Sequence, residues 1–168
     1  ALWADDLKGQ PDKSAPAGWR RYSFSSAPGL SIDLPAPPKK QKMAGAPGIK
    51  SINVYVSTGG KAVALVESFE FSTSVESAGF RQNFFPAAFS SFKSNFEKTS
   101  GLKLKVANHK AVQLGKMTGF EVNYLNPKMV GRVRIVLQDK KGFLMSAFVP
   151  KISEKQLDQF IQSAKLIP

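Results

Sequence analysis

The chain has 168 residues, and its 24 lysines and arginines outnumber its 12 aspartates and glutamates, so the formal net charge is +12. This length suits one domain, and 42% hydrophobic with 21% charged residues is ordinary for a folded globular protein. The chain has no cysteine and one histidine, His109, which excludes disulfides, thiolate metal sites, cysteine nucleophiles and clusters of histidine ligands. No apolar run approaches the ~20 residues of a membrane-spanning helix. We therefore predict a protein without enzymatic activity, cofactor or metal.

The first 18 residues are rich in proline, glycine and polar residues and show no hydrophobic period. We predict a flexible leader over residues 1–18 and a single α+β domain over residues 19–168. The start Ala1-Leu2-Trp3-Ala4 suits the mature end that a signal peptidase leaves, or the last residues of the signal itself. Trimming of the sequence at its start is an equal alternative.

Strand patterns fill the first part of the domain. Trp19–Phe24 and Leu30–Leu34 alternate apolar and polar residues, which is typical of half-buried strands. Ile52–Ser57 and Ala62–Phe71 are separated by a turn with a Gly-Gly pair, which predicts a hairpin. Pro35–Lys50 lies between the first two strands and this hairpin. We predict a solvated loop here, with a binding loop as the alternative. This loop carries a cluster of three lysines, Lys39, Lys40 and Lys42.

The segment Ser74–Lys98 contains the main predicted helix. Proline is best tolerated in the first turn of a helix, so we expect a short helical piece or a loop first and then a helix that starts near Phe85 or Pro86. Four phenylalanines then fall on one stripe, which predicts burial against a sheet. Phe80 and Phe84 lie off this stripe and need another burial partner. The stripe consists of Phe85, Phe89, Phe92 and Phe96.

The chain then returns to strand patterns and closes with a helix. His109 falls between two of the expected strands, in a predicted surface turn. The last expected strand is apolar on both faces, which is typical of a central strand. Ser153 and Gln156 have capping-box spacing, so we expect the final helix to start there and to end near Leu166. The expected strands are Leu102–Val106, Ala111–Leu114, Gly119–Leu125, Val130–Leu137 and Phe143–Val149.

Short turns between strands require antiparallel pairing, and a few helices among many strands indicate helices packed on a sheet. We predict an α+β fold in which helices sandwich an antiparallel sheet of about six or more strands. The order of these elements resembles the Mog1/PsbP-like superfamily, which includes DcrB-like secreted proteins and lipoproteins. The segments that carry the resemblance are the aromatic strand Trp19–Phe24, the proline-terminated strand Gly29–Pro35, the hairpins of residues 119–149 and the end Phe160–Leu166.

This resemblance implies a similar fold and a binding or assembly role outside the cytoplasm, in the periplasm or secreted. Lipoproteins of this kind are attached through a cysteine, which this sequence lacks. A membrane tether would therefore lie in a segment that is not part of this sequence. No motif of the superfamily matches position by position, so the resemblance implies no functional residues.

Basic residues give the strongest functional pattern. Alternate residues of a strand project from the same face, so Lys103 with Lys105, and Arg132 with Arg134, each share a face. If the two strands are close together, these four cations form one binding stripe for an acidic protein or an anionic surface. Even spreading of the positive charge for solubility is the alternative. Nucleic acid ranks third as a partner, because the aromatic residues belong to the core and not to a stacking surface.

The competing hypothesis is an adaptor that holds an apolar peptide or helix in a groove beside the sheet. Phe80 and Phe84 are its candidate groove residues, since they lack a place on the helix stripe. Catalytic candidates are weaker. Glu67, Glu70 and Glu121 would have to meet in pairs to act as acid and base, and exposed strand faces or salt bridges explain them better.

Overall fold

The computed structural model describes residues 9–24, 28–41, 43 and 48–168. In these residues, two antiparallel sheets and two α-helices form an α+β fold, which confirms the predicted fold class. The larger sheet has the strand order β4-β5-β6-β10-β9-β8-β7, and the smaller sheet has the order β1-β2-β3-β11. The large-sheet strands are β4 (Lys39–Gln41), β5 (Ile49–Gly59), β6 (Ala62–Phe71), β7 (Lys105–Leu114), β8 (Met117–Leu125), β9 (Met129–Gln138) and β10 (Lys141–Pro150). The remaining elements are β1 (Gln10–Pro11), β2 (Arg20–Phe24), β3 (Gly29–Leu34), α1 (Ala78–Ser100), the 3-10 turn η2 (Lys151–Ser153), α2 (Lys155–Ser163) and β11 (Lys165–Ile167).

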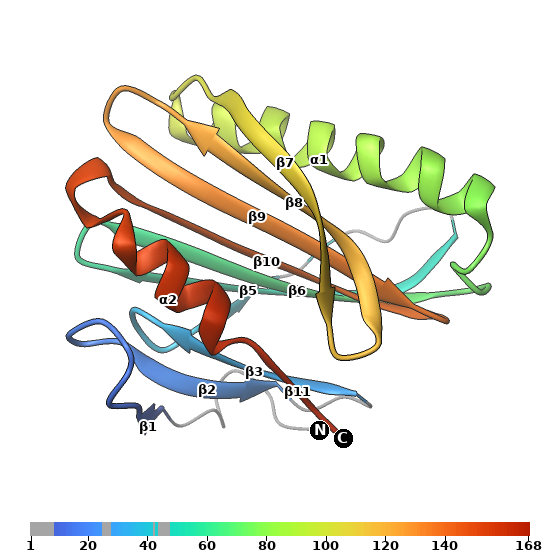
Figure 1. The fold of residues 1–168 in the computed structure, drawn as a ribbon, viewed down its shortest axis with the longest axis horizontal. Helices are drawn as coiled ribbons and strands as arrows, with labels where there is room; N and C mark the ends of the chain where they lie inside the picture. Colours follow the sequence, from blue (N-terminus) through green and yellow to red (C-terminus); the bar gives the residue numbers. More distant parts are fainter. Residues whose placement is uncertain (1–8, 25–27, 42, 44–47) are drawn as a thin grey trace.

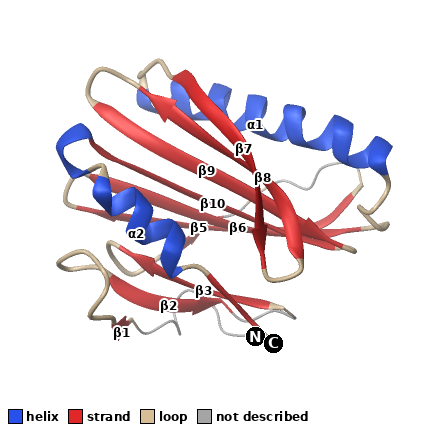
Figure 2. Ribbon diagram, viewed as in Figure 1, coloured by secondary structure: helices blue, strands red, loops and turns tan. Residues whose placement is uncertain are grey.

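The elements form layers on the two faces of the large sheet. Helix α1 covers one face, and α2 with the small sheet covers the other (Figure 1; Figure 2). Strand β10 shows how the sequence builds both cores, because its side chains alternate between the two faces. Met145 and Ala147 pack toward α2, whereas Leu144 and Phe148 pack toward α1. The prediction of a central strand here is confirmed, since β10 pairs with both β6 and β9.

Helix α1 begins earlier than expected. The Ser77 side chain accepts a hydrogen bond from the Phe80 backbone N–H at 3.2 Å and caps the helix, so Pro86 lies inside α1 and not in its first turn. Proline removes one helical hydrogen bond, but Pro86 is exposed and α1 packs along the sheet on both sides of it. The prediction of the start was therefore wrong, whereas the predicted phenylalanine stripe does pack on the sheet.

Three further expectations were wrong. Strand β7 runs without interruption through His109, with a bulge between Val106 and Asn108 in place of a turn. Helix α2 begins at Lys155 and has no side-chain cap, because the η2 turn after β10 takes up Ser153. The end of the chain then leaves the helix, and β11 pairs with β3.

Part of the predicted leader belongs to the fold, since β1 pairs with the start of β2. Residues 1–8 lie outside the described residues, so the leader and domain boundaries stay a prediction. None of the helices in the described part of the chain is long and apolar enough to cross a membrane.

Candidate binding surface

Arg132 and Arg134 project from β9 on the face that α2 covers. Arg134 lies opposite Glu121 of β8 and donates to its Oε1 at 2.9 Å from Nη2 and 3.2 Å from Nε. Arg132 donates to Asn123 at 2.8 Å and forms an ion pair with Asp158 of α2. The side chains of Arg132 and Arg134 are only 17% and 13% exposed. Both predicted cations are therefore held by carboxylates of the same chain.

The exposed cations lie two strands further out than the arginines, on or just before the edge strand β7. Lys110 is opposite Glu121 and contacts its Oε2 at 3.5 Å, but the lysine side chain is 64% exposed. Lys105 starts β7 and is exposed, with no ion pair to a described residue, and Lys103 is exposed just before the strand. We call Lys103, Lys105 and Lys110 the basic edge.

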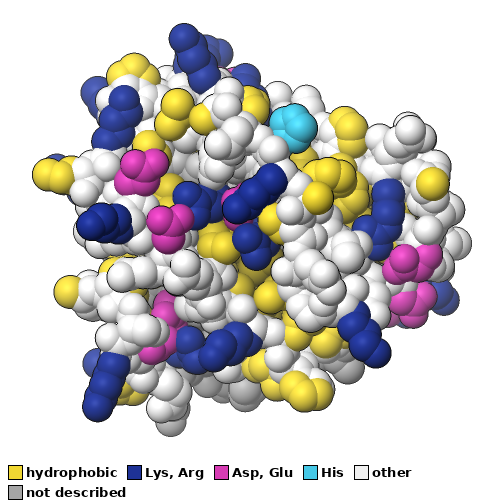
Figure 3. All heavy atoms as spheres, in the orientation of Figure 1, with side chains coloured by type: hydrophobic (Ala, Val, Ile, Leu, Met, Phe, Trp, Pro, Cys, Tyr) yellow, Lys and Arg dark blue, Asp and Glu magenta, His cyan; other side chains and the backbone are white. Residues whose placement is uncertain are grey.

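Lys105, Lys110 and the two arginines share one face of the large sheet, whereas Lys103 precedes β7 and lies near Glu97 of α1. Lys105 is opposite Leu125, and Lys110 is opposite Glu121; these two partners are an even number of residues apart on β8, so both lysines face the same way. Glu121 in turn faces Arg134. Figure 3 shows lysine and arginine side chains gathered in the middle of this face, with acidic side chains among them. The predicted strands are thus close together, and part of their charge is neutralised.

The loop lysines lie elsewhere. Lys39 and Lys40 are exposed on β4, at the opposite end of the strand order from β7. Lys42 lies outside the described residues. The structure therefore does not bring the loop lysines to the basic edge, and any role of theirs in binding stays a separate prediction.

Phe80 and Phe84 contribute to the core between α1 and the sheet. Phe71 meets both rings edge-on, with centroid distances of 5.4 Å to each, and the two helix rings stack at 5.5 Å. Their burial partner is thus the end of β6. Both rings are half-buried, and neither of them lines the pocket described next.

An open pocket lies instead between the start of α1 and the β7–β8 hairpin. It has a volume of about 780 Å³, and its surface is mostly apolar. Phe120 is 40% exposed and packs edge-on against Phe85, with ring centroids 5.0 Å apart. The sequence pattern did not single out Phe120, because alternation predicted it to be buried. The lining residues that matter below are Ala78, Gln82, Phe85, Ala111, Gln113 and Phe120.

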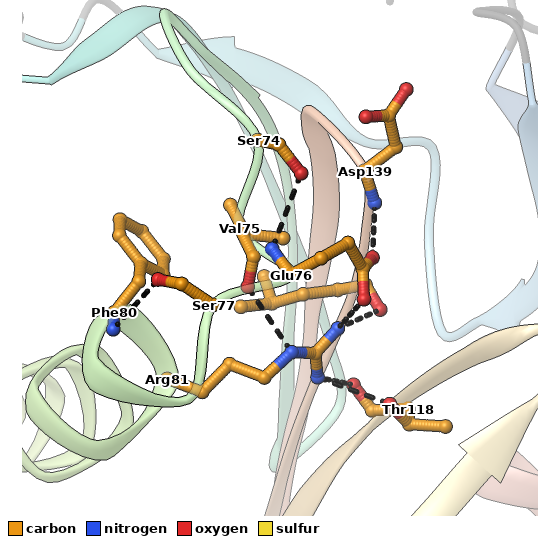
Figure 4. A network of polar contacts seen from close by, with 9 residues as sticks. Ser74, Val75, Glu76, Ser77, Phe80, Arg81, Thr118 and Asp139 are labelled. Atoms are coloured by element: carbon orange, nitrogen blue, oxygen red, sulfur yellow. Dashed lines mark hydrogen bonds and ion pairs between the residues drawn. The ribbon is translucent and has the colours of Figure 1, made fainter.

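Arg81 fixes the helix end of this pocket. Its guanidinium donates to the backbone carbonyls of Val75, Thr118 and Leu137 at 3.1–3.2 Å, and to the Thr118 hydroxyl at 3.0 Å (Figure 4). Glu76 joins the network through its contact with Arg81 and accepts a 2.6 Å hydrogen bond from the Asp139 backbone N–H. One arginine thereby ties α1 to β8 and β9, so the pocket wall is built in advance of any ligand.

A pair of carboxylates that the sequence did not reveal lies in the small sheet. Arg21 contacts Asp12 at 2.6 Å and Asp33 at 3.4 Å. Burial, reinforced by the hydrogen bond and charge of Asp12, raises the pKa of Asp33 to about 6. Hydrogen bonds, chiefly from Ser14, lower the pKa of Asp12 to about 2. Arg21 and the two aspartates connect the segment before β2 to the small sheet. Which residues pair in this way depends on the strand register, and the spacing of residues in the sequence does not give that register.

The three glutamates considered as acid–base pairs do not meet. Glu121 is paired as described, and Glu70 contacts Lys50 at 3.5 Å. Glu67 lies on the opposite face of the sheet from Glu121, in the row of Leu144 and Ile135. His109 is exposed on β7. Among the described residues, no three histidine, aspartate or glutamate side chains come together as a metal site would require.

Glu67 gives a direct test of pH dependence. It is half-buried without an ion pair or hydrogen bond to a described residue, and burial raises the pKa of Glu67 from 4.5 to about 7. A raised carboxyl pKa means that the folded state binds the proton more tightly, so stability falls as the pH rises from about 4.5 to 7. We expect Glu67→Gln to leave stability unchanged at pH 4 and to raise the free energy of unfolding by about 1–3 kcal/mol at pH 8.

Urea unfolding of both proteins across this pH range measures the difference. The raised pKa of Asp33 also lowers stability as the pH rises, but it does so equally in the wild type and in the variant. The difference between the two free energies of unfolding therefore reports on Glu67 alone. An equal effect of Glu67→Gln at pH 4 and pH 8 would show that its carboxyl group titrates normally.

The fold has a solved counterpart. The solution structure of cyanobacterial PsbP (CyanoP) from Synechocystis sp. PCC 6803 matches 94% of this chain and 98% of its own, with a TM-score of 0.56 and 13% sequence identity. The crystal structure of LpqN, involved in cell envelope biogenesis of Mycobacterium tuberculosis, matches 96% of this chain and 83% of its own, with a TM-score of 0.43 and 12% identity. No protein-family model and no curated protein matches the sequence. The first match shows a PsbP-like fold and only the fold, and membership of the Mog1/PsbP-like superfamily stays a prediction.

Proposed function

We propose that this protein is a non-catalytic binding or assembly module that docks an acidic protein through its basic edge. The supporting observation is that Lys105 and Lys110 on β7, and Lys103 just before it, are exposed, while Arg134 already neutralises the nearby carboxylate of Glu121. An approaching acidic group therefore meets lysine charges that Glu121 does not fully neutralise. Arg132 and Arg134 lie further into the sheet and balance the charges of Asp158 and Glu121, so the net positive charge of this surface comes from the lysines.

The proposed location is outside the cytoplasm, in the periplasm or secreted. This part of the proposal rests on the resemblance to secreted members of the Mog1/PsbP-like superfamily. The absence of catalytic function is supported by the separation of the glutamates and by the exposed, isolated position of His109 on β7. The proposal requires neither a cofactor nor a metal.

A second candidate function is an adaptor for an apolar peptide, favoured by the mostly apolar pocket beside Phe120. Salt separates the two functions. Attraction between exposed charges is screened at physiological salt beyond about 8 Å, so docking through lysines weakens steeply as salt is added. Binding of an apolar peptide in the pocket would change little with salt.

The test measures binding of monodisperse poly-glutamate by isothermal titration calorimetry at increasing NaCl concentrations. We expect the dissociation constant to rise with salt, and Lys105→Gln/Lys110→Gln to weaken binding about three- to tenfold at low salt, because each exposed pair contributes up to ~1 kcal/mol. The matched control is Lys61→Gln/Lys151→Gln, which removes the same charge from exposed positions in the β5–β6 turn and in η2.

Equal losses in the two double variants would mean that only net charge matters, and would overturn docking at the basic edge. Vesicles that contain anionic phosphatidylglycerol provide the other arm. If such vesicles bind through Lys105 and Lys110 while poly-glutamate does not, the partner is a lipid surface and the proposal of an acidic protein is wrong.

A further inference from the structure

We infer that β7 binds an extended acidic segment of the partner as an additional strand of the large sheet. This inference rests on the proposed function, because it specifies how the acidic partner is held. It differs from charge attraction alone by requiring backbone hydrogen bonds along one edge of the sheet.

The outer side of β7 is a long, open sheet edge. The strand is 10 residues long and lies last in the strand order, where its only sheet neighbour is β8. No backbone hydrogen bond joins its outer side to another described segment. Alternate residues of an edge strand direct their N–H and C=O groups away from the sheet, which makes the edge a template for an incoming strand. The edge strand at the opposite end, β4, is only 3 residues long.

The two faces of β7 differ in chemistry. Lys105 and Lys110 project toward the α2 face, and the bulge between Val106 and Asn108 brings them into phase despite their odd spacing. On the α1 face, Val106 and Ala111 lie opposite Tyr124 and Phe120. Val106 is 54% exposed, so apolar surface remains open on that face, five residues before Ala111, which lines the pocket.

An added strand would present its side chains alternately to these two environments. Residues on the α2 face would meet Lys105 and Lys110, which favours glutamate or aspartate. Residues on the α1 face would meet Ala111 and Phe120 and reach the pocket beside Phe85, which favours small or medium apolar side chains. The preferred occupant is therefore an extended segment in which acidic and apolar residues alternate.

The same lysines argue against a second copy of this chain as the occupant. Pairing of two β7 strands would bring two sets of exposed lysines together, and like charges across strands are destabilising. Lysines on an edge strand protect it from such self-association. An acidic segment removes this repulsion, so the charge pattern selects a partner of opposite sign.

The probe is a ten-residue peptide of alternating glutamate and valine, used where sedimentation shows the peptide alone to be monomeric. Two variants carry backbone N-methyl groups, one on every valine and the other on every glutamate. Only alternate residues of an added strand donate to β7, so one N-methylated peptide should bind like the parent. The other should bind more than about tenfold more weakly, since each lost hydrogen bond contributes ~1 kcal/mol. Fluorescence anisotropy of labelled peptides measures both.

The protein variants separate this inference from the proposed function. If Lys105→Gln/Lys110→Gln weakens all three peptides and neither N-methylated peptide is impaired, acidic docking stands and strand addition is wrong. If this variant behaves like Lys61→Gln/Lys151→Gln, the proposed function fails. A further readout is amide hydrogen exchange, in which the parent peptide should slow exchange in β7. Unchanged exchange of the β7 amides in the saturated complex would overturn strand addition.

Discussion

Phe148→Ala is expected to lower the free energy of unfolding by about 3–5 kcal/mol, the usual range for truncating a buried aromatic side chain. Phe148 is 2% exposed and lies at the centre of the contact between α1 and the sheet. Its ring stacks on Phe96 of α1 at 4.2 Å and on Phe92 at 6.0 Å. Loss of this ring removes the contact that holds the second half of α1, and urea denaturation followed by circular dichroism measures the cost.

Phe120→Ala provides the matched control. The Phe120 ring is 40% exposed and meets only one described ring, that of Phe85, so its loss should cost clearly less than the loss of the Phe148 ring. Equal costs for the two substitutions would contradict the packing described here.

Gly131 makes the same prediction testable by a double-mutant cycle. Gly131 lies opposite Phe148, and a Cβ atom at Gly131 would lie 2.1 Å from the nearest ring atom. Gly131→Ala should therefore destabilise the wild type, because the ring has no room to move within the core. In the Phe148→Ala background the same substitution should be tolerated, and additive effects would show that the ring does not cover Gly131.

The core of this fold follows directly from local sequence patterns. The double-sided apolar run in β10 identifies the central strand, and the phenylalanine spacing identifies the buried stripe of α1, because both patterns record which faces are covered. The start of α1 did not follow. Pro86 indicated a later start, but in the structure Ser77 caps the helix, and Phe80 and Phe84 of its first turns pack against Phe71 of β6.

The geometry of the candidate binding surface was predicted only in part, since strand periodicity gives a residue's face but not its neighbours. Arg132 and Arg134 were correctly placed on one face. The carboxylate partner of Arg132 comes from α2, 26 residues away in the sequence, and that of Arg134 comes from β8, 13 residues away. Register and helix docking determine those pairs. The continuous edge of β7 was also hidden, because the bulge near Asn108 takes the place of the expected turn.

Glu121→Ala is expected to lower the free energy of unfolding by about 3–5 kcal/mol, because it leaves a largely buried guanidinium without its counter-charge. The Glu121 side chain is 1% exposed and accepts two hydrogen bonds from Arg134. Replacing both partners, as in Glu121→Leu/Arg134→Met, should recover most of the loss, since well-packed apolar residues often substitute for a buried ion pair. Chemical denaturation of Glu121→Leu, Arg134→Met and the double variant gives the coupling energy, and an additive result would mean that the pair does not interact.

Lys110→Gln is the informative control, because Lys110 contacts the same carboxylate from the solvent side. An exposed ion pair contributes at most ~1 kcal/mol, so this variant should unfold almost like the wild type. A large loss in the free energy of unfolding would mean that both Lys110 and Arg134 are needed to neutralise Glu121. Lys110 would then be required for stability and could not leave Glu121 to bind a partner. With the expected small loss, Arg134 alone satisfies the buried carboxylate. Lys110 is then free to exchange an intramolecular contact for a carboxylate of the partner, which is the step that docking at the basic edge requires.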